Sequence, residues 1–290
     1  VHVPVAIGFQ KSHEPLVVMQ ETRAPVLVHH VQVISCTGNL QAWHRERASK
    51  DARSLDDLML QARACVPPRG FSRAIRETPH LAVIAEIKRR SPSKGDLNAD
   101  LDAAVMARSY QSGGASCLSV LTDENHFGGS VADLQQARDA CSLPVIRKDF
   151  TVDGRDVCDA RIMGADCVLL IAAALSSSEL KEFLDIARGI DIDALVEIHD
   201  ERELETAINA GASMIGVNQR DLVTFAVDHD RAVRMGALIP TDCVKVAESG
   251  VRGVEDALSL RHAGYDAVLV GEHLVTAPNP AAALTELCVE

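Results

Sequence analysis

Aromatic residues are scarce in this chain. Phe, Tyr and Trp make up 3% of its 290 residues, although hydrophobic residues of all kinds make up 47%. A core of ordinary size must therefore be built from Val, Leu, Ile and Ala, the mixture expected of strands that are buried on both faces. This composition excludes a chain that is disordered throughout and favours a parallel α/β fold.

Positive charge is scarce as well. The chain carries 29 Lys and Arg against 41 Asp and Glu, which gives a formal net charge of -12. An acidic protein repels polyphosphates and anionic lipids, so we expect neither nucleic acid nor a membrane as a partner. A small anionic substrate would need positive side chains gathered at its own binding site.

Signals for metal binding, secretion and membrane insertion are missing. The eight cysteines form no Cys-x-x-Cys pair and have no zinc-type spacing with His. We interpret them as reduced, mostly buried residues of a cytoplasmic protein without a metal site. No apolar run approaches the ~18 residues that span a bilayer. The first ten residues also lack the basic start and apolar core of a secretory signal.

The N-terminal part divides into two segments. Residues 1–40 show no sustained period of either two or 3.6, because three prolines interrupt their apolar pairs, so we assign them as an extension of unknown role. Residues 41–80 have a helical pattern. Within them Ser54 is placed to cap a helix that carries Leu58, and Pro67 ends it.

A short aliphatic run, a polar loop and a segment of helical period repeat from residue 81 to the end. The predicted strands are 81–87, 117–121, 144–146, 167–171, 194–198, 214–217, 244–247 and 267–270. Glycines at 114, 164, 211 and 264 stand in similar turns before four of these strands, where a left-handed residue ends a helix.

Eight strands that alternate with helices predict a (β/α)8 TIM barrel over residues 81–290, capped by the helical segment 41–80. A doubly wound open sheet is the alternative. It is disfavoured because the Gly-x-Gly-x-x-Gly fingerprint is missing after the first strand.

Polar side chains stand at nearly every predicted strand end. Glu86 and Lys88 are two positions apart at the first end, so their side chains point the same way. That pair alone fits a structural ion pair and a catalytic pair equally well. The other ends carry Thr122, Asp123, Arg147, Lys148, Glu197, Asn218, Arg220, Glu248, Ser249, Gly271 and Glu272. Because the carboxyl ends of barrel strands meet at one face, this concentration predicts an active site there.

The last two strand ends are rich in small residues. Ser249 and Gly250 follow the seventh strand, and Gly271 and Glu272 follow the eighth, each pair offering backbone N–H groups ahead of a helical segment. Many barrels bind phosphate in these two loops, so we predict a phosphate site here. Two ordinary turns are the alternative.

Seven motifs stand in order along the chain. They are IAEIKRRSPSKG (84–95), LTDENHFGGS (121–130), LPVIRKDF (143–150), ALVEIHD (194–200), IGVNQRDL (215–222), AESGV (247–251) and VLVGEHLV (268–275). Together they resemble the indole-3-glycerol phosphate synthase family of tryptophan biosynthesis, over residues 45–290. The resemblance implies closure of 1-(2-carboxyphenylamino)-1-deoxyribulose 5-phosphate to indole-3-glycerol phosphate, with loss of carbon dioxide and water.

The resemblance also implies catalytic roles. Lys148 matches a general acid that protonates the ribulose carbonyl, and burial or a neighbouring cation such as Lys88 would have to depress its pKa toward neutrality. Glu197 matches the general base. Lys88 would contact substrate anions or serve in dehydration, Glu86 would orient Lys88 or the substrate hydroxyls, and Asn218 would position the substrate. Which lysine serves which proton transfer stays open.

Further residues are assigned to substrate binding by the same resemblance. They are Ser91, Ser249, Gly250, Gly271 and Glu272 for the phosphate, Arg220 and Glu248 for the charge network, and Phe127, Phe150, Leu169 and Ile171 for the anthranilate ring. The apolar members of this set are equally explained as plain core. Glu272 stands where the family often has Ser, so its carboxylate must point away from the phosphate. We expect surface or loop roles for Arg89, His126 and His199.

The N-terminus departs from the family pattern. The resemblance implies an opening helix that helps to cover the substrate, and only residues 39–53 are left to supply it. Substrate affinity is therefore expected to differ even if the barrel is intact.

Two other functions stay open beside a carboxy-lyase without metal or cofactor. One is a Schiff-base aldolase or related phosphate-binding barrel with Lys88 or Lys148 as nucleophile. The other is a non-catalytic barrel that binds a phosphate ligand. The expected partner is a small phosphorylated substrate. Other tryptophan-pathway enzymes are further candidates, and a monomer or weak oligomer is expected.

Overall fold

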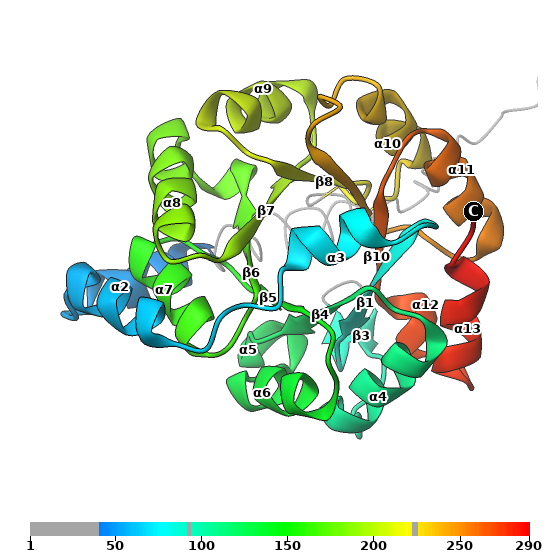
Figure 1. Cartoon of the computed structure of the whole chain (residues 1–290), viewed down its shortest axis with the longest axis horizontal. Helices are drawn as coiled ribbons and strands as arrows, with labels where there is room; N and C mark the ends of the chain where they lie inside the picture. The colour runs from blue at the N-terminus through cyan, green and yellow to red at the C-terminus, as the bar shows by residue number, and fades with distance from the viewer. Residues whose placement is uncertain (1–40, 92–93, 222–225) are drawn as a thin grey trace, which may run out of the picture.

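The computed structural model describes residues 41–91, 94–221 and 226–290 (Figure 1). Eight parallel strands close into a barrel in the order β1-β10-β9-β8-β7-β6-β5-β4, and β1 pairs with both β4 and β10. Helices lie around the outside of the barrel. This confirms the predicted (β/α)8 barrel, and the doubly wound alternative is wrong. The predicted extension over residues 1–40 lies outside the described residues.

Each predicted aliphatic run forms a barrel strand. The strands are β1 (Ala82–Ile87), β4 (Cys117–Leu121), β5 (Val145–Lys148), β6 (Cys167–Ile171), β7 (Asp193–Ile198), β8 (Met214–Asn218), β9 (Val244–Glu248) and β10 (Ala267–Val270). β5, β8 and β9 extend further than predicted, because their last residues are polar and the apolar pattern stops before them. Lys148, Asn218 and Glu248 are therefore fixed within strands.

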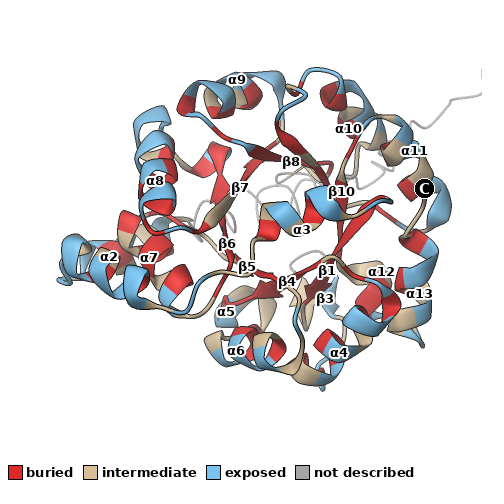
Figure 2. Cartoon of the chain, viewed as in Figure 1, coloured by how far each residue is buried: buried red, intermediate tan, exposed pale blue. Residues whose placement is uncertain are grey.

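Amphipathic helices form the outer layer. They are α4 (Ala103–Gly113), α6 (Val131–Ala140), α7 (Gly154–Ile162), α8 (Ser177–Gly189), α9 (Glu201–Ala210), α10 (His229–Gly236), α11 (Val254–His262) and α13 (Pro280–Leu287). Figure 2 shows buried residues on the sides that face the strands and exposed residues on the outer sides. The predicted glycine turns all have positive φ; at Gly114 and Gly211, which end α4 and α9, φ is 95° and 86°. A residue with a Cβ would be strained there.

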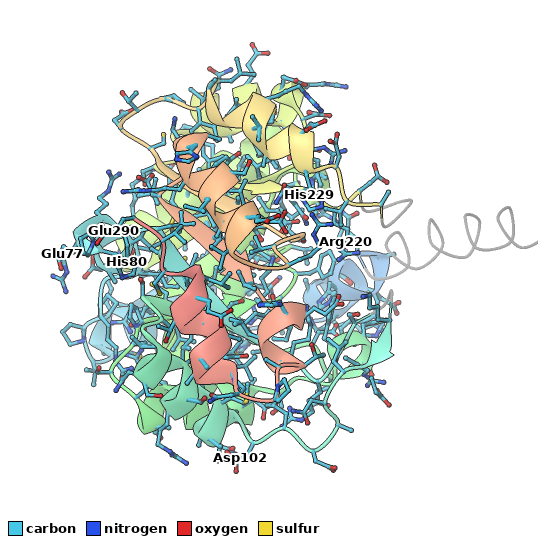
Figure 3. The ribbon with its side chains drawn as sticks, turned by 90° about the vertical axis from the view of Figure 1, so that its right-hand side faces the viewer. Glu77, His80, Asp102, Arg220, His229 and Glu290 are labelled. Carbon is cyan, nitrogen blue, oxygen red and sulfur yellow. The ribbon has the colours of Figure 1, made fainter. Side chains whose placement is uncertain are left out.

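Side chains close the N-terminal end of the barrel. The short helix α3 (Phe71–Glu77), which the sequence did not predict as a separate element, crosses this end (Figure 1). It buries Phe71 and Ile75 among the inward-facing apolar residues of the strands. Figure 3 places Glu77, His80 and Glu290 at this end and Arg220 and His229 at the opposite end. The N-terminal end is thus a continuation of the apolar core.

Short elements follow the C-terminal ends of the strands. They are β2 (Arg90–Ser91), β3 (Gly95–Asp96), α5 (Glu124–Phe127), the 3-10 turn η1 (Ala172–Ala174) and α12 (Glu272–Val275). β2 and β3 pair antiparallel after β1. Within the described ranges, no helix is both long and apolar enough to cross a bilayer.

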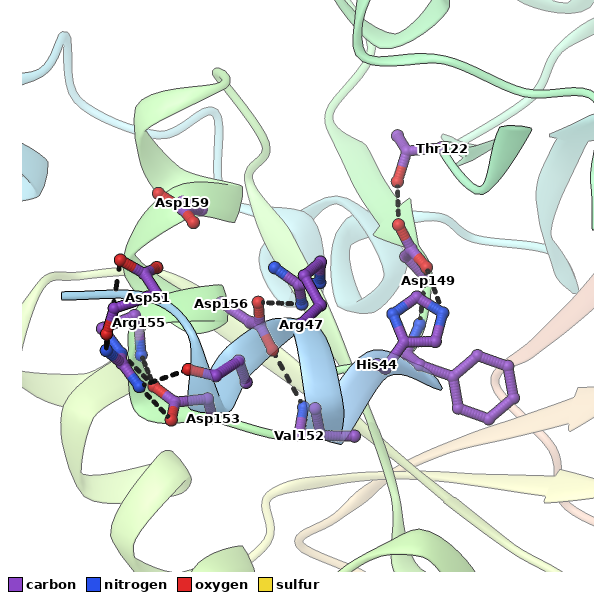
Figure 4. A network of polar contacts seen from close by, with 12 residues as sticks. His44, Arg47, Asp51, Thr122, Asp149, Val152, Asp153, Arg155, Asp156 and Asp159 are labelled. Atoms are coloured by element: carbon purple, nitrogen blue, oxygen red, sulfur yellow. Dashed lines mark hydrogen bonds and ion pairs between the residues drawn. The ribbon is translucent and has the colours of Figure 1, made fainter. Parts of the chain in front are cut away.

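The N-terminal segment adds two helices to the barrel. Residues 41–49 are helical, and α2 (Leu55–Ala64) starts at Ser54, whose side chain accepts a bond from Asp57 N, so the predicted cap is confirmed. α2 packs on α7. The helix of residues 41–49 is tied to the barrel by Arg47, which donates to Asp156 at 2.6 Å (Figure 4). The two helices hold this segment to the barrel.

Candidate active site

Four charged side chains form one layer inside the C-terminal end of the barrel. They are Glu86 on β1, Lys148 on β5, Glu197 on β7 and Glu248 on β9. These are alternate strands of the barrel, which is how a TIM barrel fills each interior layer. Two residues earlier on the same strands are Ile84, Ile146, Leu195 and Val246, which belong to the apolar interior. Since side chains alternate along a strand, the charged layer lies directly above an apolar one.

Glycines make room for the buried carboxylates. A Cβ placed on Gly216 of β8 would overlap Glu248 Oε1, and one on Gly271, after β10, would overlap Glu86 Oε1. Gly271 is also close to Lys88, whose Nζ would lie 3.0 Å from that Cβ. The predicted phosphate-site glycine at 271 therefore also gives space to the Glu86–Lys88 pair.

Lys148 joins two carboxylates across the barrel. Its Nζ donates to Glu197 Oε2 at 2.8 Å and to Glu248 Oε2 at 3.0 Å. Asn218 Nδ2 donates to the other oxygen, Glu197 Oε1, at 3.0 Å. On β1, Lys88 pairs with Glu86, as the alternation predicted. The layer thus contains an acid candidate and a base candidate in direct contact.

The layer shifts the pKa values of Lys148, Glu197 and Glu248 differently. Burial alone would lower the pKa of Lys148, but the charges of Glu197, Glu248 and Glu86 raise it well above its ordinary value. The expected depression of the Lys148 pKa is therefore wrong. Burial raises the pKa of Glu197, but Lys148 and His199 lower it to about 2. Burial and the charge of Glu197 together raise the pKa of Glu248 to about 7, although Lys148 lowers it. One carboxylate is thus firmly ionised and its neighbour is close to half-protonated at neutral pH.

The predicted phosphate-site residues lie around the ends of β9 and β10. Ser249 and Gly250 both have positive φ, 67° and 80°. Ser249 is thus held in a conformation that costs an L-residue about 1 kcal/mol. Glu272, the first residue of α12, pairs with Lys94 on the loop after β1, so its carboxylate is engaged by that lysine. Ser91 lies in β2, on the same loop.

The remaining predicted binding residues are less closely joined. Phe150 is half-buried at the edge of the interior cluster that contains Leu169 and Ile171. Phe127 ends α5 and is half-buried. Arg220 lies at the open end of the barrel (Figure 3), and its backbone N donates to Asn218 Oδ1 at 3.0 Å. Leu169, Ile171 and Phe150 are therefore part of the apolar interior, and Phe127 lies on the short helix after β4.

Of the three residues expected to have surface or loop roles, two fit. Arg89 pairs with Asp133 and also donates to loop carbonyls, and His126 contacts Asp123 beside it. His199 does not fit, because its side chain is only 12% exposed and lies against Glu197. The sequence carried a signal for this position, since His199 is two residues beyond Glu197 and follows the alternation of β7.

Three buried side chains in the described part of the chain can offer ligand atoms to a metal ion: His44, Asp123 and Asp149. His44 Nε2 lies 3.4 Å from Asp123 Oδ2 and 3.8 Å from Asp149 Oδ1. Arg147 already pairs with Asp149 at 2.9 Å, so this aspartate has a positively charged partner without a metal ion. We interpret this group, of which Figure 4 labels His44 and Asp149, as a polar anchor for the helix of residues 41–49.

His44 also brings that helix to the candidate site. Its ring stacks on Phe150, with centroids 5.3 Å apart. The sequence did not indicate His44, because its contacts lie more than seventy positions away along the chain. The helix of residues 41–49 therefore contacts Phe150, which follows β5. That residues 39–53 cover the substrate stays a prediction.

Comparisons with known proteins agree with this geometry. The family model described as indole-3-glycerol phosphate synthase matches residues 40–287. A protein of Streptomyces coelicolor named indole-3-glycerol phosphate synthase 2 is 51% identical over 236 residues, which cover 81% of this chain and 90% of that protein. The indole-3-glycerol phosphate synthase of Mycobacterium tuberculosis is 45% identical over 249 residues, 86% of this chain and 91% of that protein.

Solved structures show the same fold at low identity. A 3-hexulose-6-phosphate synthase of Salmonella typhimurium aligns with a TM-score of 0.59 and 15% identity, over 72% of this chain and 97% of that one. A thiamine phosphate pyrophosphorylase of Pyrococcus furiosus aligns with a TM-score of 0.54 and 15% identity, over 72% of this chain and 94% of that one. At this identity the likeness concerns the fold alone.

Proposed function

The chain belongs to the indole-3-glycerol phosphate synthase family, and from this premise we propose how its residues carry out the reaction. It is an enzyme of the lyase type that acts in tryptophan biosynthesis. The chemistry we propose in detail is that of a carboxy-lyase: ring closure of 1-(2-carboxyphenylamino)-1-deoxyribulose 5-phosphate, with loss of carbon dioxide and water. Neither a Schiff-base aldolase nor a non-catalytic phosphate binder is favoured, because the family match covers the whole barrel.

Lys148 acts as the general acid. Its contacts with Glu197 and Glu248 keep it protonated at neutral pH, so it is loaded with the proton that the reaction needs. When the anthranilate ring attacks the ribulose carbonyl carbon, Lys148 gives this proton to the carbonyl oxygen, which becomes a hydroxyl group. Substrate must draw the lysine away from its carboxylates, and this separation is part of the barrier.

Glu197 acts as the general base, and its strength depends on Lys148. Although burial raises its pKa, the charge of Lys148 holds it at about 2, which makes a weak base. Once Lys148 has given up its proton, that charge is gone and the pKa of Glu197 rises. Glu197 then removes the proton whose departure forms the new double bond during dehydration. The contact therefore orders the two steps, with acid action first.

Lys88 and Glu86 serve the other side of the site. Lys88 is 15% exposed in its side chain and lies beside Gly271, so it can meet an anionic group while Glu86 fixes its position. We assign it to a substrate anion and to the hydroxyl that leaves in dehydration. Asn218, bonded to Glu197 Oε1, orients the base.

Substrate binding uses the loops around this layer. The phosphate is bound by Ser91, Ser249, Gly250, Gly271 and the backbone of Glu272, whose carboxylate is held by Lys94. The anthranilate ring lies near Phe150, which His44 stacks on, with Phe127 as a second wall. Arg220 and Glu248 complete the charge network.

The observation that carries these roles is the contact of Lys148 with both Glu197 and Glu248. Lys148→Met should lower indole-3-glycerol phosphate formation, followed by indole fluorescence, by at least about a thousandfold, because the acid is removed. Its melting temperature should also fall, because Glu197 and Glu248 are left buried without their cation, so this variant and its control are assayed at a temperature at which their unfolding curves show them folded. The matched control is Lys245→Met on β9. The Nζ of Lys245 donates to Gly236 O with a bond length of 2.8 Å, and this contact lies outside the site. Turnover by Lys148→Met within tenfold of the control would refute the assignment.

The family assignment also supports a cytoplasmic location, as for other enzymes of small-molecule biosynthesis. We propose a monomer or weak oligomer, with other tryptophan-pathway enzymes as partners. Gel filtration of the whole chain tests the first of these proposals.

A further inference from the structure

His199 lies next to the proposed base but has no role in the mechanism above. It follows β7 directly, two residues beyond Glu197, and its side chain is 12% exposed against 3% for Glu197. The two ring nitrogens face different carboxylates. Nε2 lies 3.6 Å from Glu197 Oε1, and Nδ1 lies 3.1 Å from Glu203 Oε2.

Glu203 anchors the ring from outside the barrel. It stands in the first turn of α9, and its Oε2 accepts a bond from His199 N at 2.7 Å as well as facing Nδ1. Its own N–H is capped by Asp200 Oδ1 at 2.8 Å. Both the backbone and the ring of His199 are therefore fixed by one carboxylate, and Nε2 can only face Glu197.

The two oxygens of Glu197 have different tasks. Oε2 accepts from Lys148 at 2.8 Å, so it is the oxygen on the side of the acid. Oε1 accepts from Asn218 at 3.0 Å and faces His199 Nε2, which is buried and has no hydrogen-bond partner among the described residues. A donor at Oε1 would fix the rotation of the carboxylate and keep Oε2 directed to the reacting atoms.

We propose that His199 is a positioning residue for Glu197: its Nε2–H holds Glu197 Oε1, and this hold is present only while the imidazole is protonated. In the neutral ring the single proton lies on Nδ1, because Glu203 accepts it. Nε2 then presents a lone pair to Glu197 Oε1, and Asn218 is left as the donor to that oxygen. The inference rests on the proposed role of Glu197 as the base.

The surroundings favour the protonated ring. Burial lowers the pKa of His199, but the bond with Glu203 and the charges of Glu197, Glu203 and Glu248 raise it above its ordinary value. Three carboxylates from β7, α9 and β9 thus face the ring, and Lys148 on β5 faces it only across Glu197. The rate should therefore fall as rising pH removes the proton of His199, at a pH above the ordinary pKa of a histidine.

A pair of amide variants separates the two nitrogens. His199→Gln places an N–H donor where Nε2 stood, and it cannot titrate. His199→Asn places its amide where Nδ1 stood and leaves Glu197 Oε1 without this donor. At pH 7 we expect His199→Asn to lose about tenfold in kcat, the worth of one hydrogen bond to a charged group, and His199→Gln to stay within about threefold of wild type. KM should change little in either, since neither nitrogen touches substrate.

The pH profile gives the second readout. The alkaline limb of the wild-type kcat profile should be absent in His199→Gln. In Glu203→Gln the limb should move to lower pH, because the charge that holds the Nδ1 proton is gone. His126→Gln is the matched control, since His126 also lies against a carboxylate, Asp123, but not against Glu197. It should keep the wild-type kcat and the wild-type limb.

Equal activity of His199→Gln and His199→Asn, whether both high or both low, would overturn the proposal. So would an alkaline limb that persists unchanged in His199→Gln. If one of these variants fails to fold, as judged by its melting curve, the shift in Glu203→Gln decides alone. A wild-type enzyme without synthase activity would instead refute the proposed function, because every comparison uses it as the reference.

Discussion

The two ends of the barrel both contain buried carboxylates, but these differ in how many of their oxygens accept hydrogen bonds. At the N-terminal end Asp166 is fully buried, and its oxygens accept bonds from Arg69 N at 2.7 Å, Val145 N at 2.8 Å and the Arg138 side chain. At the C-terminal end Glu248 is equally enclosed, yet its Oε1 has no hydrogen-bond partner in the described part of the chain. A buried polar group without a partner costs stability. The contrast shows which end is built for stability and which for a ligand.

The same type of aspartate contact occurs twice at the N-terminal end. Asp266 stands in the turn before β10 as Asp166 stands in the turn before β6, and its Oδ2 accepts from Lys245 N at 2.8 Å at the start of β9. Each aspartate therefore ties a turn to the first or second residue of the preceding strand. The C-terminal end has no such repetition, because each of its side chains has a different task.

The largest effect on stability should follow from removing the buried carboxylate of Asp166 at the N-terminal end. Asp166→Ala leaves Arg138 and two backbone N–H groups without their acceptor, and should lower the free energy of unfolding by about 3–5 kcal/mol. The kcat of the fraction that remains folded should not change, because the site is at the other end. Denaturant unfolding and active-site-normalised kinetics measure the two quantities. The exposed Asp185→Ala on α8 is the control and should cost less than about 1 kcal/mol. An equal loss in both variants would show that burial does not matter here.

A smaller effect on stability should follow from replacing the buried carboxylate of Glu248 at the C-terminal end. The folded-state pKa of Glu248, about 7, lies above its ordinary value of 4.5. Its contribution to stability is therefore fully present below pH 4.5 and is lost as the pH rises through 7. Glu248→Gln, which cannot ionise, should gain stability relative to wild type between pH 5 and pH 8, by roughly 2 kcal/mol. Because the charge of Glu248 also raises the pKa of His199, the difference between the two proteins includes a change in the titration of His199. A difference that stays constant with pH would contradict the raised pKa.

The smallest effect concerns backbone strain. Ser249→Gly removes the cost of a positive φ of 67° and should raise the free energy of unfolding by up to about 1 kcal/mol, while the lost hydroxyl raises KM. Asp191, with φ 57°, is the other non-glycine residue at positive φ in the described chain and lies outside the site. Asp191→Gly should give a similar gain with unchanged KM. If KM is also unchanged in Ser249→Gly, the hydroxyl does not bind the phosphate.

The sequence predicted the barrel because its signals are local. Aliphatic runs define the strands, and the glycine turns recur before four of them. The polar strand ends were less well placed: the prediction stopped short of Lys148, Asn218 and Glu248, since a polar residue ends an apolar pattern whether or not the strand continues. α3 was not predicted because it is short and its buried pair, Phe71 and Ile75, is too small a signal.

The members of the site could be predicted, but their electrostatics could not. Glu86 and Lys88 pair as their spacing required. For Lys148 the direction of the pKa shift was wrong, because the sequence does not show that two carboxylates from β7 and β9 converge on it. His44 was missed as a site neighbour because Asp123, Asp149 and Phe150 lie far from it along the chain. His199 was missed although its spacing from Glu197 carried the signal.

The buried side chains of Phe71 and Ile75 also affect how substrate and product enter and leave the barrel. Because these side chains fill the N-terminal end, we expect substrate and product to pass through an opening at the C-terminal end, where the charged layer lies. Under the proposed reaction, carbon dioxide and water are small enough to escape past a bound indole product, but the next substrate has to wait until that product leaves. The helix of residues 41–49 stands beside the opening, so turnover should depend on how fast the product passes it.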